Sequence, residues 1–229
     1  GASLIIIKDI NKHQYKNRMV YPLSKITIIP ILLSRVKEIK GLKNLPAKPP
    51  YILAINHLSY IDSIIISALI AKYRNQKTSF LTKDKDKFYR FFGKIITNRW
   101  ASCIPISDKK YALEEASKRL NNKGIIGVHP EGHRSYNPKQ MLEGRTGMTR
   151  LALWNKVDII PIGIQGTEKI MPPPGSKIKS LKKTITIKIG EPISLKKYYN
   201  KKITRKLLRI ITDQIMEKIA KLSHQKYKT

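Results

Sequence analysis

Cysteine is nearly absent from this chain of 229 residues, which contains a single one, Cys103. One cysteine excludes an intramolecular disulfide bond and a cysteine-rich zinc site, so a reducing interior is expected. Long apolar runs are also missing, because no stretch reaches the ~18 to 20 residues that a membrane-spanning helix needs. The sequence therefore predicts no spanning helix, and no signal peptide is expected.

Acidic side chains are scarce. Asp and Glu together number 15 against 46 Lys and Arg, which gives a formal net charge of +31. A field of that sign concentrates anionic partners, namely nucleic acid, acidic lipid headgroups or phosphorylated substrates. A drift in composition gives the same charge, because Lys, Ile and Asn all have A/T-rich codons, and the charge alone leaves both explanations open. The hydrophobic content of 41% is that of an ordinary folded protein, and the length fits one domain.

One short apolar segment, residues 26–34 (ITIIPILLS), is a candidate for contact with a membrane. It is too short to span a bilayer and is interrupted by Pro30, but Lys25 and Arg35 flank it. This arrangement suits a segment that lies in the headgroup plane, although a segment packed against the rest of the chain fits equally well. The sequence thus predicts an N-terminal interfacial, membrane-associating segment over residues 1–40 and one folded domain over residues 41–229.

Short apolar runs that are expected to be strands alternate with longer segments that are expected to be helices. The predicted strands are residues 51–55, 79–81, 102–106, 125–128, 159–164 and 184–189. The predicted helices are residues 62–71, 86–96, 109–120, 146–154 and 203–222, with Asp108 as the N-cap of the third. This alternation predicts a single α/β domain with a mainly parallel or mixed sheet flanked by helices.

The first group of residues suited to catalysis is the segment 56–62 (NHLSYID), where a predicted strand ends and a predicted helix begins. Ligands usually bind at that position in open α/β sheets. A histidine can take a proton from an alcohol when a carboxylate fixes its tautomer, and Asp62 is close enough to turn back onto His57. The simpler interpretation, a loop histidine beside a helix-capping aspartate, stays open for this motif alone.

A second group, residues 129–135 (HPEGHRS), directly follows another predicted strand. Gly132 permits a tight turn, and Arg134 supplies a planar fork that can bind phosphate in a bidentate manner. Glu131 is suited to orient that guanidinium or a substrate hydroxyl. A purely structural turn with a surface arginine is the alternative.

The same segment raises the question of a metal site, because His129, Glu131 and His133 alternate along it. Pro130 and Gly132 are incompatible with the helical zinc motif that carries two histidines, and the single cysteine excludes the paired-cysteine motif of zinc deaminases. Metal binding is therefore the minor alternative, and no metal site is predicted.

Taken together, the two motifs resemble those of the glycerolipid acyltransferases, the family of 1-acyl-glycerol-3-phosphate acyltransferases. They read N-H-x-x-x-x-D and, further along the chain, x-P-E-G-x-R-S. Residues 104–106 (IPI) fall where the family has its second motif, and residues 160–163 (IPIG) fall where it has its fourth. With residues 41–46 (GLKNLP) as the lead-in to the first strand, the resemblance extends from about residue 41 to residue 164, with the four motifs in the family's order.

The resemblance implies a glycerolipid acyltransferase-like fold and the transfer of a fatty acyl group to the hydroxyl of lysophosphatidic acid, which gives phosphatidic acid. Acyl-CoA or an acyl carrier protein thioester would be the co-substrate, with no bound cofactor. His57 would be the general base and Asp62 its orienting carboxylate, without an acyl-enzyme. Another lysophospholipid or glycerol 3-phosphate is the alternative acceptor.

The family motifs also imply which residues bind the acceptor, mainly through its phosphate. They are Glu131, Gly132, Arg134, Ser135, Arg145, Lys109 and Lys110.

This chain departs from the family pattern at several positions. Arg145 stands where the family often has a phosphate-binding lysine, and His133 and His129 replace a threonine and an aromatic or aliphatic residue. Asp108 stands where the second motif often ends in an arginine, so Lys109 and Lys110 become the candidates to supply that charge. These departures make a lysophospholipid with a different headgroup a more credible acceptor.

The resemblance and the charge together predict a peripheral, monotopic protein on the cytoplasmic face of a membrane. Its expected partners are an anionic membrane surface and the lysophospholipid acceptor, with an acyl carrier protein as a further candidate. The alternative from a different class, a basic nucleic-acid-binding protein, lacks a recognisable reading element in this sequence.

Overall fold

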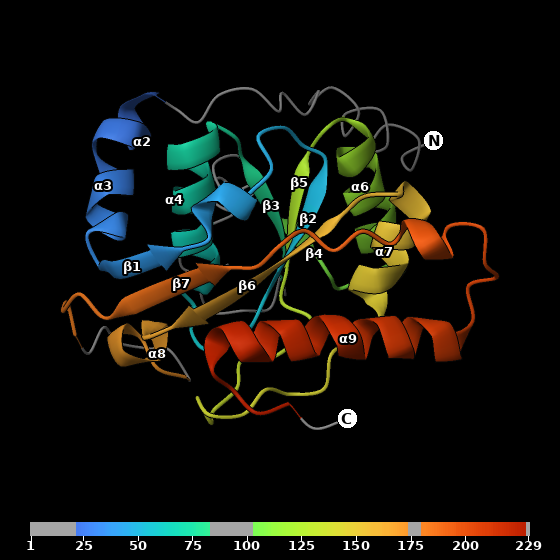
Figure 1. Ribbon diagram of the computed structural model, residues 1–229. Coiled ribbons are helices and arrows are strands. Elements are labelled where there is room, and N and C mark those ends of the chain that lie inside the picture. Colours follow the sequence, from blue (N-terminus) through green and yellow to red (C-terminus); the bar gives the residue numbers. More distant parts are fainter. Residues whose placement is uncertain (1–21, 83–102, 174–179, 228–229) are drawn as a thin grey trace, which may run out of the picture.

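The centre of the molecule is a seven-stranded sheet with the order β1-β7-β6-β2-β5-β3-β4 (Figure 1). The computed structural model describes residues 22–82, 103–173 and 180–227. The strands are β1 (Val36–Lys40), β2 (Tyr51–Ile55), β3 (Thr78–Thr82), β4 (Ile104–Pro105), β5 (Ile125–Val128), β6 (Ile159–Gln165) and β7 (Ile185–Ile189). Neighbouring strands run parallel except β6 and β7, so the predicted α/β fold with a mainly parallel, mixed sheet is confirmed.

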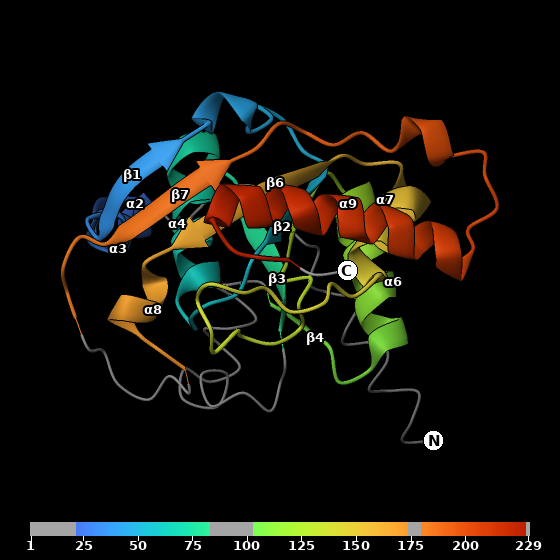
Figure 2. The ribbon, with the colours of Figure 1, turned by 60° about the horizontal axis from the view of Figure 1, so that its bottom comes forward.

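Helices cover both faces of this sheet (Figures 1 and 2). They are α2 (Pro22–Ile26), α3 (Ile28–Leu33), α4 (Asp62–Arg74), α6 (Lys109–Asn121), α7 (Gly147–Asn155), α8 (Thr167–Ile170) and α9 (Arg205–Ser223), with short 3-10 turns at Leu42–Asn44 and Lys196–Tyr198. Helix α4 packs on one face, and α6, α7 and α9 pack on the other. Helix α3 lies outside α4 and packs against it.

Strand β2 shows why the centre of the sheet consists of short apolar runs. All five of its residues are buried. Ile52 and Ala54 face the cluster formed with α6, α7 and α9, whereas Leu53 and Ile55 face the cluster formed with α4. Because both faces are covered, the strand has no polar side, which is typical of central parallel strands. This packing fixes the position of the residues that follow Ile55.

Most of the elements expected from the sequence are present with small changes at their ends. Strands 51–55 and 125–128 agree residue for residue, and Asp108 caps α6 by accepting hydrogen bonds from the N–H groups of Lys110 and Tyr111, at 2.8 and 3.1 Å. The predicted helix 86–96 lies outside the described residues. Strand β1 was not predicted, because only Val36 of its five residues is buried and its charged side chains are typical of an edge strand.

The apolar segment 26–34 divides its side chains between the core and the surface. Ile29 of α3 is buried against Ala68 and Ala71 of α4. Ile26 and Ile31, by contrast, are 78% and 63% exposed. In the part of the chain that the structure describes, none of the helices combines the length and apolar character that crossing a membrane requires. β1, which lies at the end of the predicted N-terminal segment, is an integral strand of the sheet through its pairing with β7.

Candidate active site

The two sequence motifs meet at the carboxyl ends of two adjacent strands. β2 and β5 are parallel neighbours, and Ala54 lies opposite Val128 in their register. The segments that begin at Asn56 and His129 therefore leave the sheet side by side, although they are far apart in the sequence. This edge is where ligands bind in open α/β sheets.

His57 and Asp62 form a hydrogen-bonded pair at this edge. The Nδ1 atom of His57 lies 2.9 Å from Oδ2 of Asp62. The histidine side chain is 15% exposed, whereas the Asp62 side chain is fully buried. With Nδ1 held by the carboxylate, a proton from an acceptor hydroxyl would be taken up at Nε2. The structure thus brings together the two residues that the sequence predicts as catalytic.

The surroundings of Asp62 explain how it holds its position. Its Oδ2 also accepts hydrogen bonds from the N–H groups of Leu58 and Ser59, at 2.7 and 2.8 Å. Asp62 is the first residue of α4, and its side chain binds the preceding loop instead of capping the helix N-terminus, contrary to the predicted capping role. Oδ1 has no hydrogen-bond partner within the described residues, although the Thr167 hydroxyl lies near the carboxyl group. Burial raises the pKa of this carboxyl, and the surrounding donors oppose that rise.

Asn56, directly before His57, anchors the loop that carries His57 to the next strand and to the segment after α9. Its amide group exchanges two hydrogen bonds with the backbone of Ile164 at the end of β6, at 2.9 and 2.8 Å. Its Nδ2 also donates to Oε1 of Gln225, at 2.8 Å, in the segment after α9. Asn56 is fully buried, so these contacts fix the backbone from which His57 projects.

Glu131 lies in the interior, and both of its carboxylate oxygens bind the backbone. Oε1 accepts a hydrogen bond from the N–H of His57 and Oε2 accepts one from the N–H of Leu142, each at 2.8 Å. Glu131 is 3% exposed, and burial raises the pKa of its carboxyl to about 7. These contacts differ from the predicted contact with a guanidinium or substrate hydroxyl. Through them, Glu131 connects the loop that carries His57 to the loop that carries Arg145.

The two arginines predicted to bind phosphate border this pair of loops. The guanidinium carbon of Arg134 lies 3.4 Å from the centre of the Tyr60 ring, a cation–π contact with the residue three positions after His57. Arg145 packs directly over Gly132, where an added Cβ would come within 2.5 Å of its Nε. Gly132 has a φ of 71°, so both its backbone conformation and this close approach require glycine. The described part of the chain gives the exposed Arg145 side chain no carboxylate partner.

The remaining predicted binding residues have more distant or internal positions. Ser135 is buried, and its hydroxyl donates to the carbonyl oxygens of Asn137 and Gln140, at 2.7 and 2.8 Å. Lys109 and Lys110 are exposed on the first turn of α6, after β4. Strand β4 is three places from β2 in the sheet, so the strands that precede these lysines and His57 are about 14 Å apart. Their predicted role is less direct in this geometry than that of the two arginines.

Metal ligation has no support from the described residues. Among them, no group of three or more His, Cys, Asp or Glu side chains is arranged to hold a metal ion. His129 points inward and stacks on His57, with ring centres 3.9 Å apart, whereas His133 is exposed. The alternation of His129, Glu131 and His133 in the sequence thus does not produce a shared site.

Sequence reasoning missed the support that α9 and the tail give to the Arg145 loop. Arg209 on α9 donates from Nη1 to Oε1 of Glu143 and to the carbonyl of Gly144, at 2.8 and 2.7 Å. The Tyr227 hydroxyl donates to Asp213, at 2.6 Å, and accepts from the N–H of Gly144, at 3.4 Å. A charged helix face carries no sign of which distant loop it will bind, so the sequence offered no signal for this cluster.

Comparison with known proteins agrees with this geometry. The family model described as "Acyltransferase" matches residues 37–165, which is more than half of the chain. Among solved structures, the chain is similar to the 1-acyl-sn-glycerophosphate (LPA) acyltransferase PlsC from Thermotoga maritima, with a TM-score of 0.58 and 17% identity over 99% of this chain and 90% of that chain. A search of curated proteins finds no match. At this identity the structural likeness establishes the fold, and the family match extends through all four motifs. The chain therefore belongs to the acyltransferase family.

Proposed function

We propose that this acyltransferase moves a fatty acyl group from acyl-CoA or an acyl carrier protein to the hydroxyl of lysophosphatidic acid, which gives phosphatidic acid. The observation that carries the proposal is the His57–Asp62 pair, 2.9 Å apart, at the same sheet edge as two arginines. A general base beside a phosphate-binding group is what acylation of a hydroxyl near a phosphate requires.

The reaction follows from the position of His57. Nε2 takes the proton of the acceptor hydroxyl while its oxygen attacks the thioester carbonyl, and Asp62 stabilises the resulting imidazolium. The tetrahedral intermediate collapses with cleavage of the C–S bond, and the imidazolium returns the proton to the thiolate. Backbone N–H groups are the proposed donors to the oxyanion. No acyl-enzyme forms, because the acceptor oxygen attacks the donor directly.

The acceptor's phosphate is proposed to lie between Arg134 and Arg145. Tyr60 supports Arg134 from one side, and Gly132 leaves the space that Arg145 occupies. Arg134 contacts Tyr60 in the loop that carries His57, and the N–H of Arg145 donates to the carbonyl of Pro130 in the neighbouring loop after β5, at 2.7 Å. A phosphate bound there would position the hydroxyl of its own glycerol near His57.

Thiol release from acyl-CoA tests this function directly. Lysophosphatidic acid is expected to stimulate release more strongly than lysophosphatidylcholine or glycerol 3-phosphate does. Arg145→Gln is expected to raise the KM for lysophosphatidic acid about 10-fold or more, since hydrogen bonds to charged groups contribute about 1.5 to 3 kcal/mol. Arg205→Gln removes the same charge at the exposed start of α9 and serves as the control.

Two outcomes would contradict the proposed acceptor. A clear preference for another lysophospholipid would identify the headgroup that the site accepts. An equal rise in KM for the Arg145→Gln and Arg205→Gln variants would mean that the overall charge, and not a phosphate site, attracts the substrate. If acyl-CoA releases no thiol with any acceptor, the same assay with an acyl carrier protein thioester decides between the two donors.

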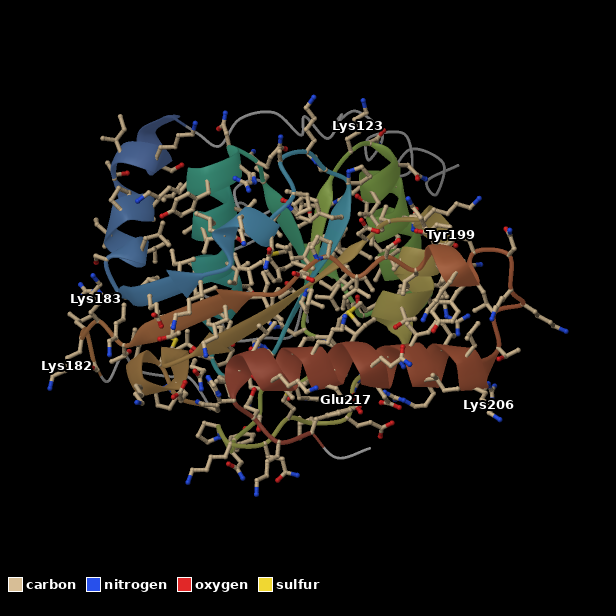
Figure 3. The ribbon with its side chains drawn as sticks, in the orientation of Figure 1. Lys123, Lys182, Lys183, Tyr199, Lys206 and Glu217 are labelled. Carbon is tan, nitrogen blue, oxygen red and sulfur yellow. The ribbon has the colours of Figure 1, made fainter. Side chains whose placement is uncertain are left out.

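We also propose that the protein binds the cytoplasmic face of an anionic membrane as a peripheral protein. The exposed Ile26 and Ile31 side chains of α2 and α3 would enter the interface, where Lys25 can meet lipid phosphates. Lysines also project from separate parts of the surface, among them Lys123, Lys183 and Lys206 (Figure 3). Each basic residue near such a surface contributes about 1 kcal/mol.

Binding to vesicles is expected to depend on both the isoleucines and the charge. The double variant Ile26→Ser/Ile31→Ser should bind phosphatidylserine-containing vesicles about 10-fold more weakly or worse, because burial of an isoleucine side chain contributes about 1.5 to 3 kcal/mol. Leu181→Ser, at a residue 59% exposed before β7, is the matched control. Co-sedimentation with the vesicles, repeated at increasing salt concentration, measures the binding. Equal binding to neutral vesicles, or preferential binding to duplex DNA, would contradict membrane docking.

A further inference from the structure

His129 occupies an unusual position against the proposed base. Its ring is stacked on the His57 ring with centres 3.9 Å apart and an angle of 12° between the planes. On another side, the Phe80 ring of β3 lies 5.5 Å away at 24°. His129 therefore stands between the catalytic ring and the sheet, and it is one of the positions at which this chain departs from the family motif.

Both ring nitrogens of His129 have partners that fix its orientation. Nδ1 lies 3.1 Å from the carbonyl oxygen of Ile55 and 3.2 Å from that of Asn56. Carbonyl oxygens only accept, so Nδ1 carries the proton and Nε2 accepts from the Ser63 hydroxyl, at 2.9 Å. These bonds join the end of β5 to the last residue of β2, to the residue before His57 and to α4.

The charge state of His129 agrees with this arrangement. Burial, together with the neighbouring His57, lowers the pKa of His129 to about 3, although Asp62 opposes the shift. The titratable groups that face it are His57 from the loop after β2 and Asp62 from α4. His129 is thus neutral when His57 changes its charge, so the stacked ring presents an uncharged aromatic face to the imidazolium that forms in the reaction.

We propose that His129 is a positioning residue whose hydrogen-bonded ring holds the His57 imidazole in the plane that joins Asp62 to the acceptor hydroxyl. The inference rests on the proposed role of His57 as the base. The hydrogen bond to Asp62 holds one atom of the His57 ring and does not by itself fix the tilt of the ring about that contact. The flat face of His129 limits the tilt, so Nε2 keeps its direction toward the acceptor.

Two matched variants separate the ring from its hydrogen bonds. His129→Leu and His129→Phe lose the same three polar contacts, but only phenylalanine keeps a flat ring against His57. His129→Leu is expected to lower kcat about 10- to 100-fold, because a misplaced catalytic group costs up to about 100-fold. His129→Phe is expected to recover most of that loss. The KM for lysophosphatidic acid should stay near its wild-type value in both variants, because the contacts of the His129 ring are with His57, Phe80, Ser63 and the backbone at the end of β2.

A spectroscopic measurement tests the same point without activity. The proton of His57 Nδ1 in its hydrogen bond to Asp62 should give a downfield NMR signal in the wild type, which persists in His129→Phe and is lost or broadened in His129→Leu. In the wild type, ¹⁵N shifts should show His129 neutral and protonated at Nδ1 from about pH 5 to pH 8. This part of the test remains informative if the leucine variant folds poorly.

The proposal is overturned by any of three results. The first is an unchanged kcat in folded His129→Leu, and the second is an equal loss of kcat in the phenylalanine and leucine variants at equal thermal stability. The third is an His129 ring that is protonated at Nε2. Failure of the proposed base would be recognised separately, because wild type and His57→Ala would then have the same activity whatever the His129 variants show.

Discussion

Replacement of His57 with alanine is expected to lower acceptor-dependent thiol release at least ~10³-fold, with an unchanged fold. General-base catalysis contributes about 10² to 10⁴-fold in enzymes, and no other described residue stands in the same relation to Asp62. The side chain is 15% exposed, and its truncation removes one donor from the buried Asp62 carboxylate, so thermal unfolding is measured beside activity to show that the variant is folded. The measurement is thiol release from acyl-CoA with lysophosphatidic acid.

The control for this variant replaces a different histidine, away from the site. His224→Asn changes an exposed residue that ends α9 at a φ of 51°, a conformation that asparagine also tolerates. It should retain full activity. A folded His57→Ala protein that keeps a tenth or more of the wild-type activity would exclude His57 as the general base and would require a different proton acceptor.

Asp62→Asn is expected to lower kcat about 10²- to 10³-fold while it preserves the geometry of the site. A single oxygen, Oδ2, accepts all three hydrogen bonds, from the His57 ring and from the N–H groups of Leu58 and Ser59. The two backbone donors will hold the amide oxygen at that position, and the new NH₂ group will replace Oδ1, which accepts no hydrogen bond from the described residues. His57 keeps its tautomer, so the variant removes the negative charge that stabilises the imidazolium.

The thermal stability of Asp62→Asn gives a second test of the role of this charge. Burial raises the pKa of the Asp62 carboxyl, so the native state holds its proton more tightly than the unfolded chain does. The contribution of this group to stability therefore falls as pH rises above the unfolded pKa of about 4, and at neutral pH the buried charge is a cost. Asp62→Asn should keep or raise the thermal midpoint at neutral pH. A large fall in the midpoint, or full activity, would disprove the role assigned to this charge.

The pairing of His57 with Asp62 and most of the sheet could be predicted because their signals are local. β2 and β5 are continuous apolar segments, and each directly precedes one of the motifs in the sequence. Asp62 follows His57 by five positions, a distance that one turn of chain can close. The edge strand β1 gave no such signal, because charged residues outnumber the single buried one.

The contacts of Glu131 could not be predicted, although its motif was recognised. Its partners are backbone N–H groups, 74 residues before it at His57 and 11 residues after it at Leu142. Every residue except proline offers such a donor, so the sequence carries no mark of which one is used. The stacking of His129 on His57 depends in the same way on the parallel register of β2 and β5, which only the fold determines.

The hydrogen bond between Asn56 and Gln225 joins residues 169 positions apart, so it can form only late in the synthesis of the chain. Strands and helices near the N-terminus can begin to fold while the ribosome is still adding residues. The loop that carries His57, however, lacks its last anchor until residue 225 has left the ribosome. A nascent chain stopped before that point is therefore expected to have much of the sheet but no fully ordered catalytic loop. Acyl transfer would begin only once translation has passed α9, which separates the time of folding from the time of activity.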